Sequence, residues 1–222
     1  MQKFETPAPI SAVLDIPAGR VQFIAADRAD TTVDVHPANA AKRRDVKVAE
    51  QTTVDYRDGV LRIDAPAARN QYLGSSGSVE VTVQLPTRSR IEGKAAFAEF
   101  RGVGRFGDVA LEAYGAVKID EAASTRLTAY AGDVEVGRLS GSAEISTQQG
   151  DIRIDEAVRG TVVLTTQMGN VTVGAADGVS ASLDAGAGYG RIHNALKNTD
   201  GAAAVLNIHS TTAYGDIVAR SL

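Results

Sequence analysis

Apolar and polar residues alternate along much of the first 88 positions, which is the period of a β-strand with one buried face. The cleanest run extends from Val79 to Leu85, where every second side chain is apolar, and Pro86 ends it. Residues 20–24 and 32–36 alternate in the same way. The pattern predicts an antiparallel β-layer over residues 1–88.

Three connections interrupt this layer. Asp58-Gly59 separates two short apolar runs, and an Asp-Gly connection favours a β-hairpin over residues 53–63. Residues 39–51 are rich in Ala, Lys and Arg, which favours a short helix over an irregular crossover. Residues 70–78 contain Gly and Ser and predict a flexible loop.

A five-residue phrase then recurs from Gly107 onward. It consists of Gly, usually a small or polar residue such as Asp or Asn, and two β-forming residues separated by one position. From Gly115 the copies are 17, 18, 19, 21 and 25 residues apart. Glycine allows the positive φ of a tight corner, and the following Asp or Asn can bond to neighbouring amides. The predicted corner residues are Gly107, Gly115, Gly132, Asp133, Gly150, Asp151, Gly169, Asn170, Gly190, Gly215 and Asp216.

A short period with turn glycines is typical of a stacked-coil architecture. Each repeat holds two short strands and two corners, and it buries an apolar face only by stacking on its neighbours. The prediction is an all-β fold, a β-solenoid of about six to seven two-strand coils. The repeats would occupy residues 89–222, and the β-layer of residues 1–88 would cap their first coil. The chain stops soon after the copy at Gly215, which predicts an uncapped C-terminal coil.

These phrases carry a resemblance to a known family. Gly-Asp-Val-Glu-Val at 132–136 and Gly-Asp-Ile-Arg-Ile at 150–154 follow a β-rich segment that contains Gly19-Arg20-Val21 and the strand at 79–86. Together they resemble the bacterial DUF4097 family of β-strand-repeat proteins, often labelled "putative adhesins". The resemblance covers nearly the whole chain. It implies a β-solenoid of unknown biochemical role, with no established catalytic residues to carry over.

Composition narrows the function classes. The 222 residues are 44% hydrophobic but only 5% aromatic, which suits a thin core of small and β-branched side chains. A net charge of −4 with both signs interspersed gives little support for nucleic acid binding. Without cysteine there is no disulfide or thiol chemistry. Neither a signal peptide nor a run of roughly 18 apolar residues is present, so a cytoplasmic protein without membrane insertion is expected if Met1 is the natural start.

For several motifs, a structural interpretation is favoured over a catalytic or ligand-binding one. Residues 102–107 match G-x-G-x-x-G, but a strand follows where a nucleotide site needs a helix. The corner acids lack the nonapeptide pattern of calcium-binding β-rolls, so local hydrogen bonding is favoured over a calcium ladder. Three scattered histidines, His36, His193 and His209, do not form a ligand set. The sequence therefore predicts no cofactor, no metal site and no catalytic residues.

The residues that precede the corner glycines are often large. Phe106, Tyr114, Met168, Tyr189 and Tyr214 occupy this position, and Tyr130 lies one place earlier in its coil. Periodic bulky residues are more often core, so packing at the coil ends is favoured. If the position faces outward instead, the aromatic residues would form a ligand or interaction face. The candidate residues of this face are Tyr114, Tyr130, Tyr189 and Tyr214.

The favoured function is a non-catalytic structural or interaction protein. Its partner would be another protein or a second copy that pairs with the C-terminal solenoid edge. The alternative is a solenoid that binds a glycan or cell-envelope polymer along the tyrosine face. An enzyme ranks third, because Asp151, Arg153 and Asp155 are equally explained as the polar side of an alternating strand.

Overall fold

The computed structural model describes residues 1–66, 77–200 and 203–222, and the predicted loop at 70–78 lies mostly outside these ranges. Within them the chain forms β-strands and one short α-helix, which confirms the predicted all-β class. The chain divides into two compact units, residues 1–115 and residues 116–222, and each is described separately.

The first unit contains one helix and seven strands in its described part. They are β1 (Gln2–Glu5), β2 (Ser11–Ala26), β3 (Asp30–Pro37), α1 (Arg43–Gln51), β4 (Thr53–Arg57), β5 (Val60–Asp64), β6 (Val79–Pro86) and β7 (Arg90–Ala113). Helix α1 confirms the helix predicted within residues 39–51. The hairpin is confirmed too: β4 and β5 pair antiparallel, and Asp58 and Gly59 both have the positive φ of a type I′ turn.

Strand β2 bends at a corner, and both of its halves contribute buried side chains to the core of this unit. Its side chains alternate between buried and accessible positions, with Leu14 and Ile16 buried before the corner at Gly19 and Val21 and Phe23 buried after it. The corner needs glycine, since φ is +136° there. Each half of β2 thus contributes one row of apolar side chains to the core.

The pairing of β2 corrects part of the sequence prediction. β2 pairs parallel with β5, β6 and β7, whereas antiparallel pairing is found for β1 with β3, β3 with β6 and β4 with β5. The layer predicted as antiparallel over residues 1–88 is therefore mixed. Alternation identifies a strand and its buried face, but it does not determine the direction of the neighbouring strand.

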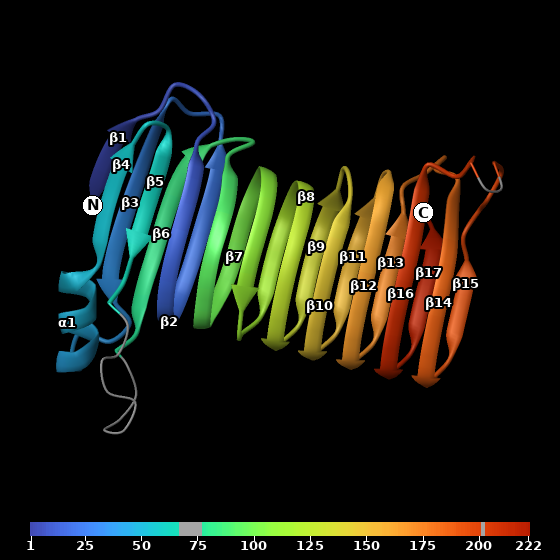
Figure 1. Ribbon diagram of the computed structural model, residues 1–222. Helices are drawn as coiled ribbons and strands as arrows, with labels where there is room; N and C mark the ends of the chain where they lie inside the picture. The colour runs from blue at the N-terminus through green and yellow to red at the C-terminus, as the bar shows by residue number, and fades with distance from the viewer. Residues whose placement is uncertain (67–76, 201–202) are drawn as a thin grey trace. The chain divides into compact units, whose positions relative to one another are not determined.

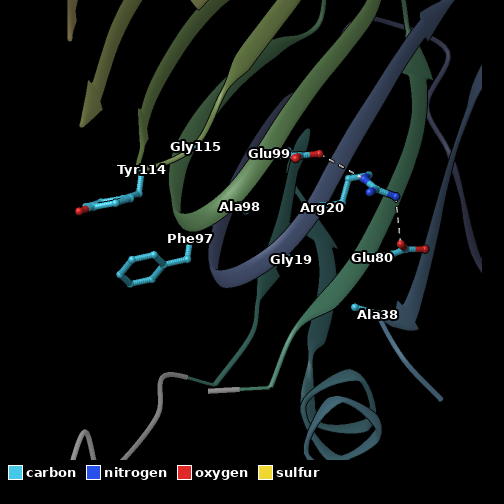
Figure 2. A pocket seen from close by; sticks show the side chains of 9 residues that line it. All are labelled: Gly19, Arg20, Ala38, Glu80, Phe97, Ala98, Glu99, Tyr114 and Gly115. Atoms are coloured by element: carbon cyan, nitrogen blue, oxygen red, sulfur yellow. Dashed lines mark hydrogen bonds and ion pairs between the residues drawn. The ribbon is translucent and has the colours of Figure 1, made fainter. Parts of the chain in front are cut away.

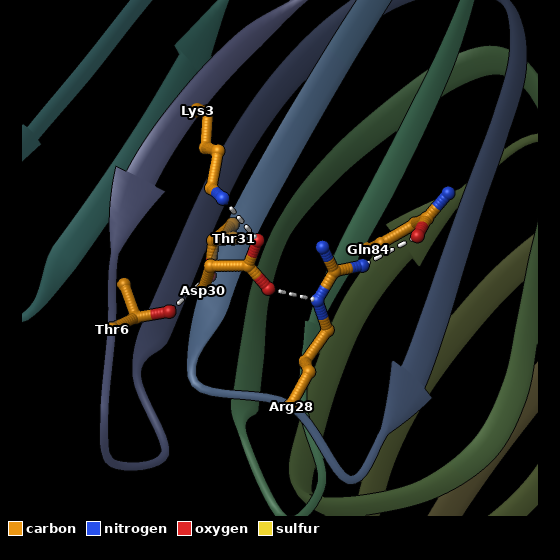
Figure 3. Close-up of polar contacts among 6 residues, drawn as sticks. All are labelled: Lys3, Thr6, Arg28, Asp30, Thr31 and Gln84. Atoms are coloured by element: carbon orange, nitrogen blue, oxygen red, sulfur yellow. Dashed lines mark hydrogen bonds and ion pairs between the residues drawn. The ribbon is translucent and has the colours of Figure 1, made fainter.

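Polar contacts link strands β1, β3 and β6 of this unit (Figure 3). Asp30 accepts a hydrogen bond from Arg28 Nε at 2.7 Å and lies 3.1 Å from Lys3 Nζ. Arg28 also contacts Gln84 of β6. The Arg28 hydrogen bond and then the Lys3 hydrogen bond lower the pKa of Asp30 to about 2. A single carboxylate thus links β1, the turn before β3, and through Arg28 also β6.

The second unit contains ten strands in its described part. They are β8 (Val117–Ala131), β9 (Val134–Leu139), β10 (Ala143–Gln149), β11 (Ile152–Ala157), β12 (Gly160–Met168), β13 (Val171–Ala175), β14 (Ala181–Tyr189), β15 (Ile192–Ala195), β16 (Leu206–Tyr214) and β17 (Ile217–Ser221). The pairings between strands in the described part of this unit are parallel.

These strands form two parallel ladders joined by the glycine corners (Figure 1). One ladder runs from the second half of β8 through β10, β12 and β16 to β14. The other runs from the first half of β8 through β9, β11, β13 and β17 to β15. Apolar side chains such as Ile145, Leu164, Ile154 and Val173 are buried between the ladders. Stacked coils thus build one continuous core, as expected for a unit that cannot bury its own face.

The last coil in the sequence is not the last coil in space. β16 lies between β12 and β14, and β17 lies between β13 and β15 (Figure 1). The prediction that the last coil of the sequence forms an uncapped edge is therefore wrong, since β17 is paired with β13 on one side and β15 on the other. Among the described residues of this unit, the strands with one ladder partner at this end are β14 and β15.

Side-chain burial agrees with this order. Leu206, Ile208, Ile217 and Ala219 of the interposed coil are buried, whereas all four residues of β15 are exposed. The more apolar coil therefore has neighbours on both sides. Because every copy of the repeat presents the same alternation, the local pattern could not predict which copies become neighbours.

Candidate functional site

The corners of residues 116–222 form a regular array. Gly132, Gly150, Gly169, Gly190 and Gly215 all have positive φ, and each lies two positions before the first residue of a strand of one ladder. Of the two earlier glycines, Gly107 lies within β7 and Gly115 follows its end. The glycine phrase therefore marks backbone corners in the second unit.

The polar residue after each corner glycine bonds to the adjacent coil. The backbone N–H of Asp151 donates to Asp133 Oδ1 at 2.8 Å, and that of Asn170 donates to Asp151 Oδ1 at 2.7 Å. Asp216 N–H donates to Asn170 Oδ1 at 2.9 Å, and Arg191 N–H donates to Asp216 Oδ1 at 2.8 Å. This Asx ladder follows the spatial order of the coils. It gives the acids a structural role, and the described residues contain no cluster of three or more His, Cys, Asp or Glu suited to a metal ion.

The residues before the corner glycines lie side by side in the strand register. Gln149 pairs with Met168, Met168 with Tyr214, and Tyr214 with Tyr189. We name these four residues the corner strip. Met168 is 50% exposed, Tyr214 56% and Tyr189 71%, so core packing, the favoured prediction for this position, is wrong for all three. Phe106, by contrast, is buried as that prediction expected.

The two tyrosines of the corner strip form a stacked pair. Their ring centroids are 5.0 Å apart and the ring planes differ by 5°. Tyr130, the remaining candidate from this unit, is 45% exposed and lies in β8, the far end of the same ladder. The structure therefore brings together Tyr189 and Tyr214 and places Tyr130 several strands away.

Tyr114, the fourth candidate, belongs to a separate hollow within residues 1–115. The hollow has a volume of about 390 Å³ and is lined by Arg20, Glu80, Phe97, Glu99 and Tyr114, among others (Figure 2). Phe97 is 66% exposed and Tyr114 is 45% exposed, and their ring centroids are 4.7 Å apart. Two neighbouring aromatic rings thus face solvent beside a concave surface.

A charged triplet forms another part of the hollow. The register places Arg20 of β2 opposite Glu80 of β6 on one side and Glu99 of β7 on the other. Arg20 Nη1 lies 3.2 Å from Glu80 Oε1, and Arg20 Nε lies 3.5 Å from Glu99 Oε2 (Figure 2). The parallel strands therefore fix one guanidinium between two carboxylates.

Sequence reasoning did not find Phe97 or this triplet as site residues. The alternation of β7 changes phase at this point: Ile91 and Ala95 are buried before it, Ala98 and Phe100 after it, and Phe97 lies between the two sets. Strand parity therefore did not predict that Phe97 is exposed. Arg20, Glu80 and Glu99 come from strands whose pairing no local pattern determines.

The other candidate motifs take structural positions. The G-x-G-x-x-G segment lies inside β7, with no helix after it. His209 Nδ1 lies 3.4 Å from Asp184 Oδ2, whereas His193 pairs with Val218 on the other ladder. Arg153 donates from Nε to Asp155 Oδ1 at 2.6 Å, and this bond raises the pKa of Arg153. These residues do not converge on one site.

In residues 116–222, two parallel ladders joined by corner glycines give an all-β class of protein built from stacked parallel strands. The chain belongs to the Toastrack DUF4097 family, whose model matches residues 13–205. This confirms the resemblance seen in the repeated phrases.

Several solved structures are similar to this chain, and the first described below, with a TM-score of 0.60, shares its fold. A "putative adhesin" from Bacteroides fragilis NCTC 9343 is 15% identical, with a TM-score of 0.60 over 98% of this chain and 95% of that chain. A "putative cell adhesion protein" from Clostridium sporogenes ATCC 15579 is 11% identical, with a TM-score of 0.43 over 100% and 98%. A "putative lipid binding protein" from Parabacteroides distasonis ATCC 8503 is 10% identical, with a TM-score of 0.43 over 100% and 95%. A comparison with curated proteins finds no match.

The one helix in the described residues, α1, has nine residues. No helix in that part of the chain has the length and apolar character needed to cross a membrane.

Proposed function

We propose that the protein is a non-catalytic interaction protein, a scaffold of about six to seven stacked coils that binds an extended polymer along the corner strip. The polymer class that fits the strip is a glycan of the kind found in cell envelopes. The observation that carries the proposal is the exposed, stacked pair of Tyr189 and Tyr214.

Exposed aromatic rings suit a carbohydrate ligand. A sugar ring has an apolar C–H face and a polar hydroxyl rim, and tyrosine matches both, with an apolar ring and a phenolic hydroxyl at its tip. Gln149 at the other end of the strip adds amide donors and acceptors. The strip contains no Asp, Glu, His, Lys or Arg side chain, which favours a neutral polymer over an anionic one.

The arrangement of the strip favours an extended ligand. Its residues come from four adjacent strands of one ladder, and adjacent strands are about 4.8 Å apart. The strip therefore runs along the stacking direction as a row of side chains. A row of this kind contacts successive units of a chain molecule.

Purified peptidoglycan sedimentation and a printed glycan array test the proposal. We expect Tyr189→Ala and Tyr214→Ala each to weaken binding about two- to tenfold, since an aromatic contact contributes about 0.5–1.5 kcal/mol. Tyr189→Phe and Tyr214→Phe keep the rings and should retain most of the binding.

Val163→Ala is the matched control, because Val163 is an exposed residue of β12 outside the strip. Unfolding midpoints of all variants should match the parent protein, since the changed side chains lie at the surface. Polysaccharide binding that survives the double alanine variant would reject the corner strip as the site.

A further inference from the structure

We propose that the hollow of residues 1–115 is a second binding site, which takes a single neutral hexopyranose ring between Phe97, Tyr114 and the Arg20 triplet. This second proposal rests on the proposed function only for the choice of a carbohydrate as the class of ligand. The residues differ from those of the corner strip, so each site can fail or succeed without the other.

The aromatic wall supplies an apolar surface for the face of the ring. Phe97 has no polar atom, yet most of its side chain is in water. Tyr114 lies against it with the ring planes inclined by 41°. An exposed aromatic pair beside a concave surface is informative, whereas isolated exposed apolar residues are ordinary. The pair covers the C–H face of a sugar and leaves the hydroxyl rim free.

The charged triplet supplies the polar contacts. Glu80 and Glu99 accept hydrogen bonds from hydroxyl groups, and the Arg20 guanidinium donates to hydroxyl or ring oxygens. All three side chains are at least 47% exposed. Exposed ion pairs of this kind contribute little to stability, so a ligand hydroxyl can share these groups at low cost.

The same groups disfavour charged ligands. Two carboxylates beside one guanidinium leave the triplet with a net negative charge, which repels an anion such as a phosphate. A cation would have to compete with Arg20, which already lies within 3.5 Å of both carboxylates. A neutral polyhydroxyl ring meets neither penalty.

The backbone fixes the site in place. Arg20, Glu80 and Glu99 occupy opposite positions on three paired strands. The backbone of Gly115 packs closely against Ala98 of β7: a Cβ added to Gly115 would lie 2.7 Å from the carbonyl oxygen of Ala98. Tyr114 N–H donates to the carbonyl of Ala95 at 3.2 Å. Sites on strands hold their geometry better than sites on loops, so little ordering is required on binding.

Saturation-transfer NMR with methyl hexopyranosides at millimolar concentration tests the site. The probes are the methyl glycosides of glucose, galactose and N-acetylglucosamine. Nα-acetyl-lysine methylamide, whose side-chain amine is free, is the cationic probe. We expect ring C–H signals from at least one glycoside, and an affinity about tenfold lower in Phe97→Ala and in Tyr114→Ala. Arg20→Ala should weaken binding as well.

The Tyr189→Ala/Tyr214→Ala variant is the control, and it should retain the glycoside signals. Circular dichroism verifies that each variant is folded. No signal from any glycoside, signals unchanged in Phe97→Ala and Tyr114→Ala, or signals from the lysine probe alone would each overturn this proposal. Polymer binding lost in the Tyr189 and Tyr214 variants would still support the proposed function in any of those cases.

Discussion

A glycine at a coil corner meets two requirements at once. Gly150 has a φ of +140°, and a Cβ built on it would overlap the carbonyl oxygen of Gly132 in the adjacent coil. Gly178 has a φ of +72°, but an added Cβ would have no heavy atom within 4 Å. Substitution at Gly178 therefore tests the cost of positive φ alone, whereas substitution at Gly150 adds the cost of the close contact between coils.

We predict that Gly150→Ala lowers the free energy of unfolding by about 3 kcal/mol and Gly178→Ala by about 1 kcal/mol. Both variants place alanine at positive φ, which costs about 1–2 kcal/mol, and Gly150→Ala adds overpacking of about 1–3 kcal/mol. Urea unfolding measures both values. Equal losses in the two variants would show that coil contact at the corner is unimportant.

Asp30 predicts a pH dependence of stability. Its pKa in the folded protein is about 2, below the ordinary 3.8, because of the hydrogen bonds from Arg28 and Lys3. The ionised carboxylate therefore stabilises the fold at pH above about 3.8, and this contribution is lost as the pH falls through about 2. We expect Asp30→Asn to have a lower Tm than the parent protein at neutral pH, and the difference to shrink between these two values.

The control for this experiment is Asp27→Asn, an exposed carboxylate in the same turn. Thermal unfolding followed by circular dichroism across the pH range compares the three proteins. A Tm difference for Asp30→Asn that stays constant down to pH 2 would contradict the lowered pKa.

At the scale of the element, local sequence carried most of the information about strands and turns. Alternation located β6, the Asp-Gly pair located the β4–β5 hairpin, and the Ala, Lys and Arg content of residues 39–51 located α1. Each of these depends on residues close together in the chain. The direction of the strands beside β2 depends on residues far apart, and it was not predictable from alternation.

The orientation of the corner strip shows a second limit of alternation. In β16, Ile208, Ser210 and Thr212 are buried, and Tyr214 has the same parity but is exposed. Tyr214 lies at the corner, past the end of the core, so strand parity no longer determines its environment. The bulky residues before corner glycines were predicted as core because periodic bulky residues are more often buried. The exposure of Met168, Tyr189 and Tyr214 became known only from the structure.

At the scale of the molecule, chain order and spatial order separate within residues 116–222. The chain forms β14 and β15 before β16 and β17, yet the later pair lies between the earlier pair and β12–β13. The Asx ladder passes through the interposed coil from Asn170 to Asp216 and on to Arg191. The C-terminal segment is thus an interior part of the stack.

This order predicts an unusual pattern of hydrogen exchange. Chain ends normally fray, but we expect amides of residues 206–221 to exchange more slowly than those of residues 181–195. The reason is that β16 and β17 are paired on both sides, whereas β14 and β15 have one ladder partner each in this unit. Hydrogen exchange measured by mass spectrometry on peptides from the two segments tests this prediction.

Two variants serve as controls. Ile208→Ala removes a buried side chain at a cost of about 2–5 kcal/mol and should speed exchange in both segments. Ile192→Ala changes an exposed position and should affect exchange in residues 181–195 alone. Faster exchange in residues 206–221 than in residues 181–195 of the parent protein would contradict the interior position of the C-terminal coil.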